Sequence, residues 1–232
     1  MQALLLSNSS DAAGYLTTHL PVIRELATGC ERAVFVPYAG VTRTWDEYTD
    51  LVQNALRPIG LNIQPLHQAQ DAQTCLRNAE LIIVGGGNTF NLLHHLRRQE
   101  LMPVIRAAVQ NGQARYLGWS AGSNLACPSI CTTNDMPIID PGGFEALNLL
   151  PFQINPHFTN SHPPGHRGET RAQRLREFCR LHPDTQVLAL PEGTGLRVDA
   201  AQIRLLGSLS ATLFVGEQPE QELNPGILQG LL

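Results

Sequence analysis

The sequence predicts an α/β fold in which helices flank a mostly parallel sheet. Short runs of consecutive apolar residues alternate with longer stretches whose apolar residues recur at helical spacing. Strands that are apolar throughout are typical of parallel sheets with both faces covered. A chain of 232 residues can bury one substantial core, and it contains neither a repeat nor a linker. We therefore expect one domain over residues 1–232.

The apolar runs and the helical patterns can be assigned in chain order. The expected strands are Ala3–Leu6, Ala33–Val36, Leu61–Ile63, Leu81–Val84, Tyr116–Gly118 and Val187–Leu190. The expected helices are Leu16–Ala27, Trp45–Leu56, Ala72–Asn78, Asn91–Arg98 and the basic segment Arg171–Arg180. Because ligands of such folds bind at the carboxyl ends of the strands, we expect the functional site there.

The alternation of predicted strands and helices becomes less regular beyond residue 130. The segment from Pro128 to Gly168 is rich in proline and glycine, and irregular segments of this length are often functional. The part from Gln186 to Val215 suggests short strands and a hairpin. We expect the remaining C-terminal residues to form a frayed polar tail.

The composition excludes several kinds of chemistry. All 16 basic residues are arginine, so no lysine is available for a Schiff base, pyridoxal phosphate, a Ser–Lys dyad or a phosphate-binding loop. The formal net charge of -4 argues against nucleic acid or an anionic membrane as a partner.

The cysteines and the chain start predict the compartment. The five cysteines are scattered, and the close pair Cys127 and Cys131 has no matching second pair, which argues against zinc. His162 and His166 likewise lack a carboxylate or cysteine at ligand spacing. We expect no metal and no cofactor.

The first residues lack the basic start of a signal peptide, and no run reaches membrane-spanning length, so we expect a cytoplasmic protein.

A Gly-x-Ser-x-Gly turn at Gly118–Gly122 follows an apolar strand directly. Two glycines allow a sharp strand-to-helix reversal that would expose the Ser120 hydroxyl beside a helix N-terminus. This pattern is typical of a nucleophile elbow. The alternative is a serine that only caps the helix.

A second glycine-rich turn, Gly85–Gly87, follows the strand Leu81–Val84. Its N–H groups could bind phosphate, but Phe90 breaks the Gly-x-Gly-x-x-Gly pattern of dinucleotide sites. A plain tight turn is another reading. Together with Ser120, the turn favours an oxyanion hole.

A catalytic serine needs a base and an orienting carboxylate. His157 follows an apolar stretch at a predicted strand end and is the best candidate for the base. Glu192 follows the strand Val187–Leu190, and Asp135 lies in the irregular segment, so either could be the acid. With Glu192, the preferred choice, the order Ser, His, acid differs from that of lipases and esterases.

The residues around these candidates carry a family resemblance. The relevant stretches are Ser7–Ser9, Pro37–Thr42, Thr44–Asp50, Val84–Phe90, Gly118–Gly122, Thr132–Ile138, Ile154–Asn160 and Leu190–Gly193. In this order they closely resemble the peptidase E family of bacterial α-aspartyl dipeptidases. The resemblance implies a flavodoxin-like fold, similar to class I glutamine amidotransferases, and a cytosolic serine peptidase that releases aspartate from Asp-X dipeptides.

The resemblance also assigns roles to residues. It implies that Ser120 is the nucleophile, that His157 is the base, and that the N–H groups of Gly87 and Ala121 form the oxyanion hole. The acid is then Glu192 or Asp135. The resemblance weakens after Gly193, so it gives no expectation for the packing of the C-terminal residues. A homodimer is one expected form of assembly.

Selecting aspartate requires a cation, which here must be arginine. Arg171 is the preferred candidate over Arg43 and Arg167, although it could belong to a solvated helix face. Asn88 is a second candidate for binding the substrate. Two other functions stay open: a cyanophycinase-like hydrolase of aspartyl–arginine polymer, and a non-catalytic, amidotransferase-like module that binds carboxylates.

Overall fold

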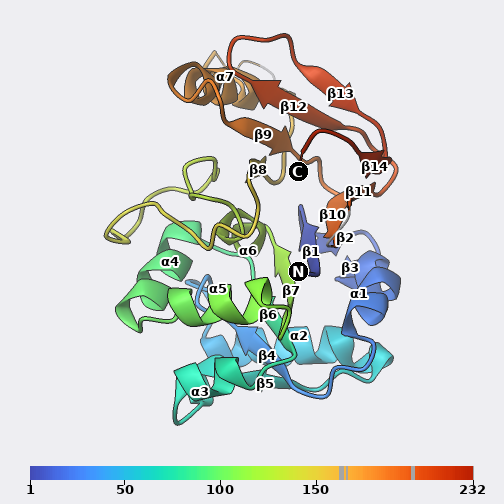
Figure 1. Ribbon diagram of the computed structural model, residues 1–232, viewed down its shortest axis with the longest axis vertical. Helices are drawn as coiled ribbons and strands as arrows, with labels where there is room; N and C mark the ends of the chain where they lie inside the picture. Colours follow the sequence, from blue (N-terminus) through green and yellow to red (C-terminus); the bar gives the residue numbers. More distant parts are fainter. Residues whose placement is uncertain (162–164, 166, 200–201, 232) are drawn as a thin grey trace.

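The centre of the molecule is a sheet with a parallel half and an antiparallel half (Figure 1). The computed structural model describes residues 1–161, 165, 167–199 and 202–231. Among these residues, eight strands form the sheet in the order β14-β11-β10-β1-β7-β6-β4-β5. The parallel strands are β1 (Ala3–Leu6), β4 (Ala33–Val36), β5 (Ile63–Pro65), β6 (Leu81–Val84) and β7 (Arg115–Trp119). The antiparallel strands are β10 (Gly195–Val198), β11 (Ile203–Leu206) and β14 (Gly226–Leu228).

Helices cover both faces of this sheet, as expected from its continuously apolar strands. The helices are α1 (Leu20–Ala27), α2 (Trp45–Leu56), α3 (Ala72–Arg77), α4 (Thr89–Arg98), α5 (Met102–Gln110), α6 (Ala121–Leu125) and α7 (Arg171–Leu181), with short 3-10 turns at η1 (Thr17–His19), η2 (Arg57–Ile59) and η3 (Leu66–Gln68). Successive strand residues point to opposite faces. Leu4 and Leu6 therefore pack with α1 and α2, whereas Leu5 packs in the cluster that contains α3 to α6. The predicted α/β class with helices on a mostly parallel sheet is confirmed.

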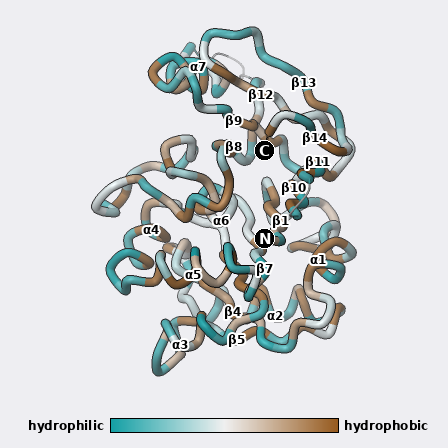
Figure 2. Tube along the Cα trace, viewed as in Figure 1, coloured by the Kyte–Doolittle hydropathy of each residue, from teal (hydrophilic) through white to brown (hydrophobic). Residues whose placement is uncertain are grey.

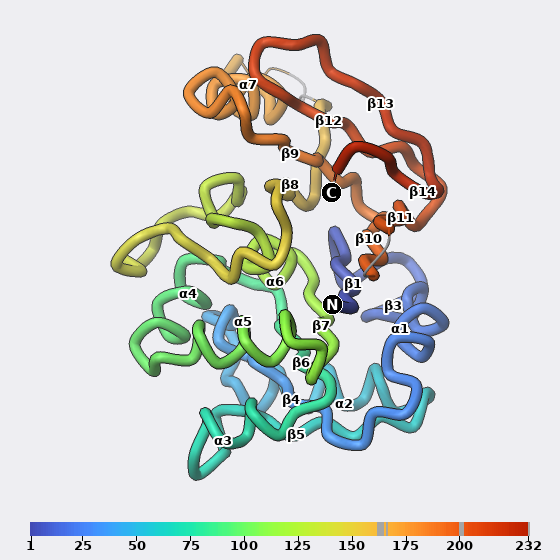
Figure 3. The backbone as a smooth tube through the Cα atoms, in the orientation of Figure 1, coloured from blue at the N-terminus to red at the C-terminus, as the bar shows by residue number. Residues whose placement is uncertain are grey.

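A second sheet lies beyond β1 and is formed by segments after residue 150, a part of the chain that also supplies β10, β11 and β14 to the central sheet (Figure 3). It consists of β8 (Gln153–Asn155), β9 (Gln186–Ala189), β12 (Ala211–Val215) and β13 (Gln221–Leu223), and α7 packs on it. The strand expected at Val187–Leu190 is thus β9, and it does not belong to the central sheet. The antiparallel strand β10 pairs with β1 instead, and β11 and β14 continue the central sheet beyond it.

Three further details differ from the sequence expectations. Helix α5 was not expected; its Pro103 lies in the first turn, where a missing N–H removes no helical hydrogen bond. The expected strand Leu61–Ile63 is shifted to Ile63–Pro65, at the sheet edge where proline is tolerated. The C-terminal tail is not frayed, because β13 and β14 pair with β12 and β11. Figure 2 shows the hydrophilic run into β13 that suggests a tail in the sequence.

Polar side chains begin the helices nearest the strand ends. Thr44 and Glu47 form a capping box at α2, and Asn88 caps α4 through Asn91 N–H.

A short hairpin of β2 (Ser10–Asp11) and β3 (Gly14–Tyr15) follows β1. No helix in the described ranges is long and apolar enough to span a membrane.

Candidate active site

Ser120 stands at the sharp turn between β7 and α6. Its backbone has φ 52° and ψ -113°, a conformation that non-glycine residues rarely adopt and that costs energy. The turn is possible because the residues two positions before and after Ser120 are glycines, which have no Cβ atom and allow close backbone contacts. A Cβ on Gly122 would lie 2.2 Å from the Val84 carbonyl oxygen, and a Cβ on Gly118 would lie 2.6 Å from that of Gly122. Both glycines of the motif are therefore required by close backbone contact.

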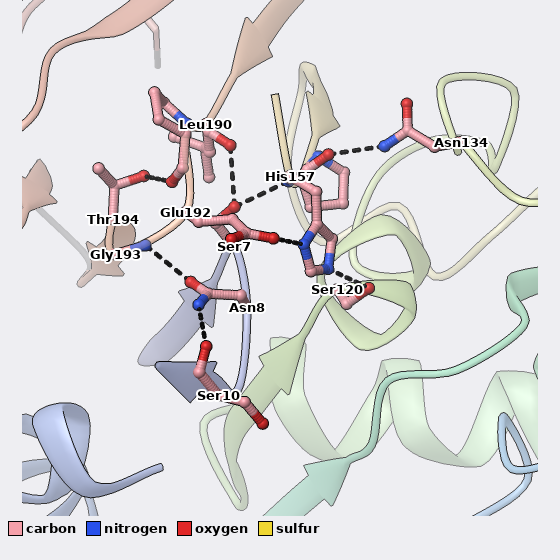
Figure 4. A network of polar contacts seen from close by, with 12 residues as sticks. Ser7, Asn8, Ser10, Ser120, Asn134, His157, Leu190, Glu192, Gly193 and Thr194 are labelled. Atoms are coloured by element: carbon pink, nitrogen blue, oxygen red, sulfur yellow. Dashed lines mark hydrogen bonds and ion pairs between the residues drawn. The ribbon is translucent and has the colours of Figure 1, made fainter. Parts of the chain in front are cut away.

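His157 lies between Ser120 and Glu192 (Figure 4). Its Nε2 is 3.0 Å from Ser120 Oγ, and its Nδ1 is 2.7 Å from Glu192 Oε1. The histidine follows β8 and has φ 53°, whereas Glu192 comes from the loop between β9 and β10. The Glu192 side chain is 63% exposed, so this ion pair adds little stability, but it can orient the imidazole.

Two residues at the end of β1 hold the loops that carry His157 and Glu192 (Figure 4). Ser7 Oγ accepts the His157 N–H at 2.8 Å and donates to the Leu190 carbonyl at 2.8 Å. Asn8 Oδ1 accepts the Gly193 N–H at 2.8 Å. The sequence marks Ser7 and Asn8 only as polar residues at a strand end. Their role was missed, because it depends on loops more than 140 residues away.

In the described residues no hydrogen bond joins Asp135, the other candidate acid, to the imidazole. Its Oδ2 accepts bonds from Thr89 N at 2.7 Å, from Thr89 Oγ1 at 2.5 Å and from Thr133 Oγ1 at 3.1 Å. These contacts attach the irregular segment to the first turn of α4. Of the two carboxylates left open by the sequence, Glu192 is the one in contact with His157.

Two backbone N–H groups flank Ser120. Within the described residues, neither the Gly87 N–H nor the Ala121 N–H has a protein acceptor. Gly87 has φ 136°, and a Cβ there would lie 2.2 Å from the Ala39 carbonyl oxygen. The preceding carbonyl, that of Gly86, accepts a bond from the Tyr48 hydroxyl at 2.9 Å. Both N–H groups predicted for an oxyanion hole are thus without a protein acceptor in the described part of the chain.

Ser120 and His157 border two pockets. The larger, of about 610 Å³, extends along Asn88, Arg43 and Tyr48. The smaller, of about 240 Å³, is lined by Asn124, Thr133, Asn134, Asp135, Pro156 and Arg171. The serine hydroxyl is therefore accessible from both sides, and the two pockets differ in size and in charge.

The two substrate-binding candidates fall in different pockets. Arg171 is half-buried in the smaller pocket, where its Nη1 donates to the carbonyls of His157 and Pro156. Burial lowers the pKa of Arg171 and the Glu192 carboxylate opposes that shift; an arginine stays protonated regardless. Asn88 lines the larger pocket, and its amide already contacts Asn91 N–H and the Met136 carbonyl.

The described part of the chain has no group of three or more His, Cys, Asp or Glu side chains that could hold a metal ion. His162 and His166, which were predicted not to form a metal site, are outside the described residues. Cys127 and Cys131 are free thiols.

Comparison with known proteins places this chain in a family. Residues 3–206 match the model of peptidase family S51. The chain belongs to peptidase family S51. Peptidase E of Salmonella paratyphi A (strain ATCC 9150 / SARB42) is 49% identical over 227 residues, which cover 97% of this chain and 99% of that protein. Peptidase E of Salmonella typhimurium (strain LT2) is 48% identical over the same length.

A solved structure supports the fold of this S51 peptidase. The crystal structure of a peptidase from an acI-B1 Actinobacterium superposes with a TM-score of 0.69 at 18% identity, over 97% of this chain and 94% of that one. The resemblance predicted from sequence motifs is confirmed at the level of the family, and so is the expectation that the chain is a peptidase.

Proposed function

We propose that this S51 peptidase is a serine dipeptidase that hydrolyses Asp-X dipeptides and releases the N-terminal aspartate. The observation that carries the proposal is the chain of contacts from Ser120 Oγ through both nitrogens of His157 to Glu192. A hydroxyl, an imidazole and a carboxylate in this order can generate a nucleophile at neutral pH.

The reaction is acyl transfer to Ser120. As Ser120 Oγ attacks the scissile carbonyl carbon, His157 Nε2 takes its proton and later gives it to the leaving amine. Glu192 accepts the Nδ1–H and stabilises the charged imidazole. Water, deprotonated by the same histidine, then attacks the acyl-enzyme and frees aspartate. A positioned general base contributes about 10²- to 10⁴-fold to such a reaction.

The N–H groups of Gly87 and Ala121 bind the oxyanion of both tetrahedral intermediates. They are held by the packing of Gly87 against Ala39 and by the start of α6. Each such donor is worth about 10²- to 10³-fold in kcat.

The smaller pocket receives the aspartyl residue, with its side-chain carboxylate on Arg171. Within the described residues, the Nε and Nη2 groups of Arg171 have no protein acceptor. A guanidinium can bind both oxygens of a carboxylate, whereas the amide of asparagine cannot accept both bonds. The larger pocket then takes the second residue of the dipeptide, beside Asn88.

The pocket charges support this function over its alternatives. A cyanophycinase-like enzyme needs acidic groups for the arginine of its polymer. The described lining of the larger pocket holds Arg43 and no Asp or Glu. A non-catalytic module that binds carboxylates would not need the contacts of His157 or the strained backbone of Ser120.

We also propose that residues 1–232 act as a single catalytic domain in the cytoplasm. The five cysteines, all in the described ranges, are free, as in proteins of reducing compartments. A homodimer is a further prediction, and measuring the molar mass of the protein in solution tests it against the 25.4 kDa of one chain.

Purified protein incubated with Asp-Leu, Asn-Leu, Glu-Leu and β-Asp-Leu tests the function. We expect rapid release of aspartate from Asp-Leu alone and none from the Ser120→Ala variant. Equal cleavage of Asn-Leu would contradict the role of Arg171. Full activity of Ser120→Ala would contradict the mechanism.

A further inference from the structure

Arg43 is a charged side chain in the larger pocket, and the proposed hydrolysis gives it no role. It lies in the loop between β4 and α2, and its guanidinium carbon is 5.4 Å from the centre of the Tyr48 ring. Within the described residues, the guanidinium forms no ion pair and no hydrogen bond with another group of the chain. An aromatic face therefore supports this cation, and its N–H donors are available to a ligand.

The carboxylate of Glu47, which lies near Arg43, already has partners. Its Oε2 accepts the Thr44 N–H at 2.8 Å and the Thr44 hydroxyl at 3.0 Å, as part of the capping box of α2. These hydrogen bonds lower the pKa of Glu47, and the charge of Arg43 adds a smaller effect. The described lining of the larger pocket holds no Asp or Glu, so no lining residue balances the charge of Arg43.

Tyr48 connects this cation to the reacting groups. The hydroxyl of the same ring donates to the Gly86 carbonyl at 2.9 Å, and Gly87 and Ser120 border the same pocket as Arg43. In an Asp-X dipeptide only the amide nitrogen and one carbon atom separate the scissile carbonyl from the α-carboxylate of the second residue. When the scissile carbonyl lies at Ser120 and the aspartyl residue fills the smaller pocket, this carboxylate therefore enters the pocket that Arg43 lines.

We propose that Arg43 binds the α-carboxylate of the second residue and so determines which leaving groups the enzyme accepts. This inference rests on the proposed function. The side chain of the second residue differs from one dipeptide to the next, whereas every dipeptide carries this carboxylate. A pocket of about 610 Å³, with one arginine in its described lining, can hold many side chains and still recognise one charged group. A peptide whose second residue is amidated has no negative charge at this position.

Two other roles of Arg43 lead to different results. Arg43 could only pack on Tyr48, and its loss would then lower kcat on every substrate, because Tyr48 contacts the peptide group between Gly86 and Gly87. It could instead bind a side-chain carboxylate, and Asp-Glu would then be preferred to Asp-Gln. The α-carboxylate takes no part in the bond changes, so its binding should affect KM and not kcat.

The experiment compares Asp-Leu with Asp-Leu amide, which lacks the α-carboxylate. Arg43→Gln should raise KM for Asp-Leu about 10-fold at constant kcat and change the kinetics on the amide little. This is the lower end of the range for a hydrogen bond to a charged group, because Arg43 is exposed to water. Arg43→Lys keeps the charge and should retain most of the preference for Asp-Leu.

The two substrates also differ in their leaving groups, so the ratio of their kcat/KM values is compared between variants. Arg98→Gln, at an exposed position of α4 outside both pockets, is the matched control and should keep the original ratio. An unchanged ratio in Arg43→Gln would overturn the inference, and so would equal losses on Asp-Leu and its amide. A loss confined to Asp-Glu would overturn it in favour of the side-chain carboxylate.

Calorimetric binding of the two peptides to Ser120→Ala gives a test that needs no turnover. Adding Arg43→Gln to that variant should weaken the binding of Asp-Leu about 10-fold and spare the amide. This binding pattern, together with no hydrolysis by the unmodified protein, would reject the proposed function and keep the carboxylate site. Hydrolysis of Asp-Leu without this binding pattern would do the reverse.

Discussion

The Tyr48 hydroxyl donates a hydrogen bond to the Gly86 carbonyl oxygen at 2.9 Å. It also accepts the indole N–H of Trp119 at 3.1 Å, and burial holds the pKa of Tyr48 well above its ordinary value. The Gly86 carbonyl and the Gly87 N–H belong to one planar peptide group. The tyrosine, on α2, therefore helps to orient the Gly87 N–H, which borders the same pocket as Ser120.

Tyr48→Phe should lower kcat by about 10-fold and leave KM nearly unchanged, because an oxyanion donor acts mainly in the transition state. Steady-state kinetics on Asp-Leu measure both constants. Tyr38→Phe is the control, since it also removes a half-buried hydroxyl contact, to Gln99, but away from both pockets. A rise in KM at constant kcat would argue against orientation of the peptide group.

Glu192→Gln should lower kcat by about 100-fold or more, because an amide in place of the carboxylate cannot stabilise the charged imidazole and can favour the wrong tautomer. Thermal unfolding should change little, since this carboxylate is largely exposed. Glu177→Gln, an exposed position on α7, should behave like the unmodified protein. Activity of Glu192→Gln within a few-fold of normal would remove Glu192 from the catalytic chain.

Gly122→Ala should lower the free energy of unfolding by about 3 kcal/mol or more, because its Cβ would collide with the backbone of β6. Chemical denaturation measures this change. Gly112→Ala is the matched case: it has a φ of 75° but open space around it, and it should cost only about 1 kcal/mol. Similar losses in both variants would show that backbone conformation matters here and that the contact with Val84 does not.

His19 should make the protein less stable in mild acid. Burial lowers the pKa of this histidine, and the nearby Asp11 opposes the shift only in part. Below about pH 6.5 the unfolded chain binds a proton that native His19 does not, so stability falls with pH by at most about 1.4 kcal/mol per unit. Urea unfolding at pH 7.0 and 5.5 should show a smaller loss in His19→Gln than in the unmodified protein. An equal loss in both would place the acid sensitivity elsewhere.

Much of the parallel half of the sheet could be predicted, because its signals are local. The boundaries of β1, β4 and β6 match the apolar runs, which extend over a few residues and need no partner to be recognised. The turn at Ser120 is local as well, since the two glycines Gly118 and Gly122 on either side of it permit the reversal. The strand β9 was predicted within one residue but in the wrong sheet, because pairing depends on which strands meet and not on the strand itself.

The class of fold, the serine turn, the glycine turn beside it and a short list of partners for the serine all follow from the order of the amino acids. The contacts of Glu192 with His157 and of Asp135 with Thr89, and the attachment of the active-site loops to Ser7 and Asn8, become visible only in the folded chain. A strand or a turn follows from neighbours within a few residues, whereas a contact across 35 residues depends on how two sheets pack and where their loops end.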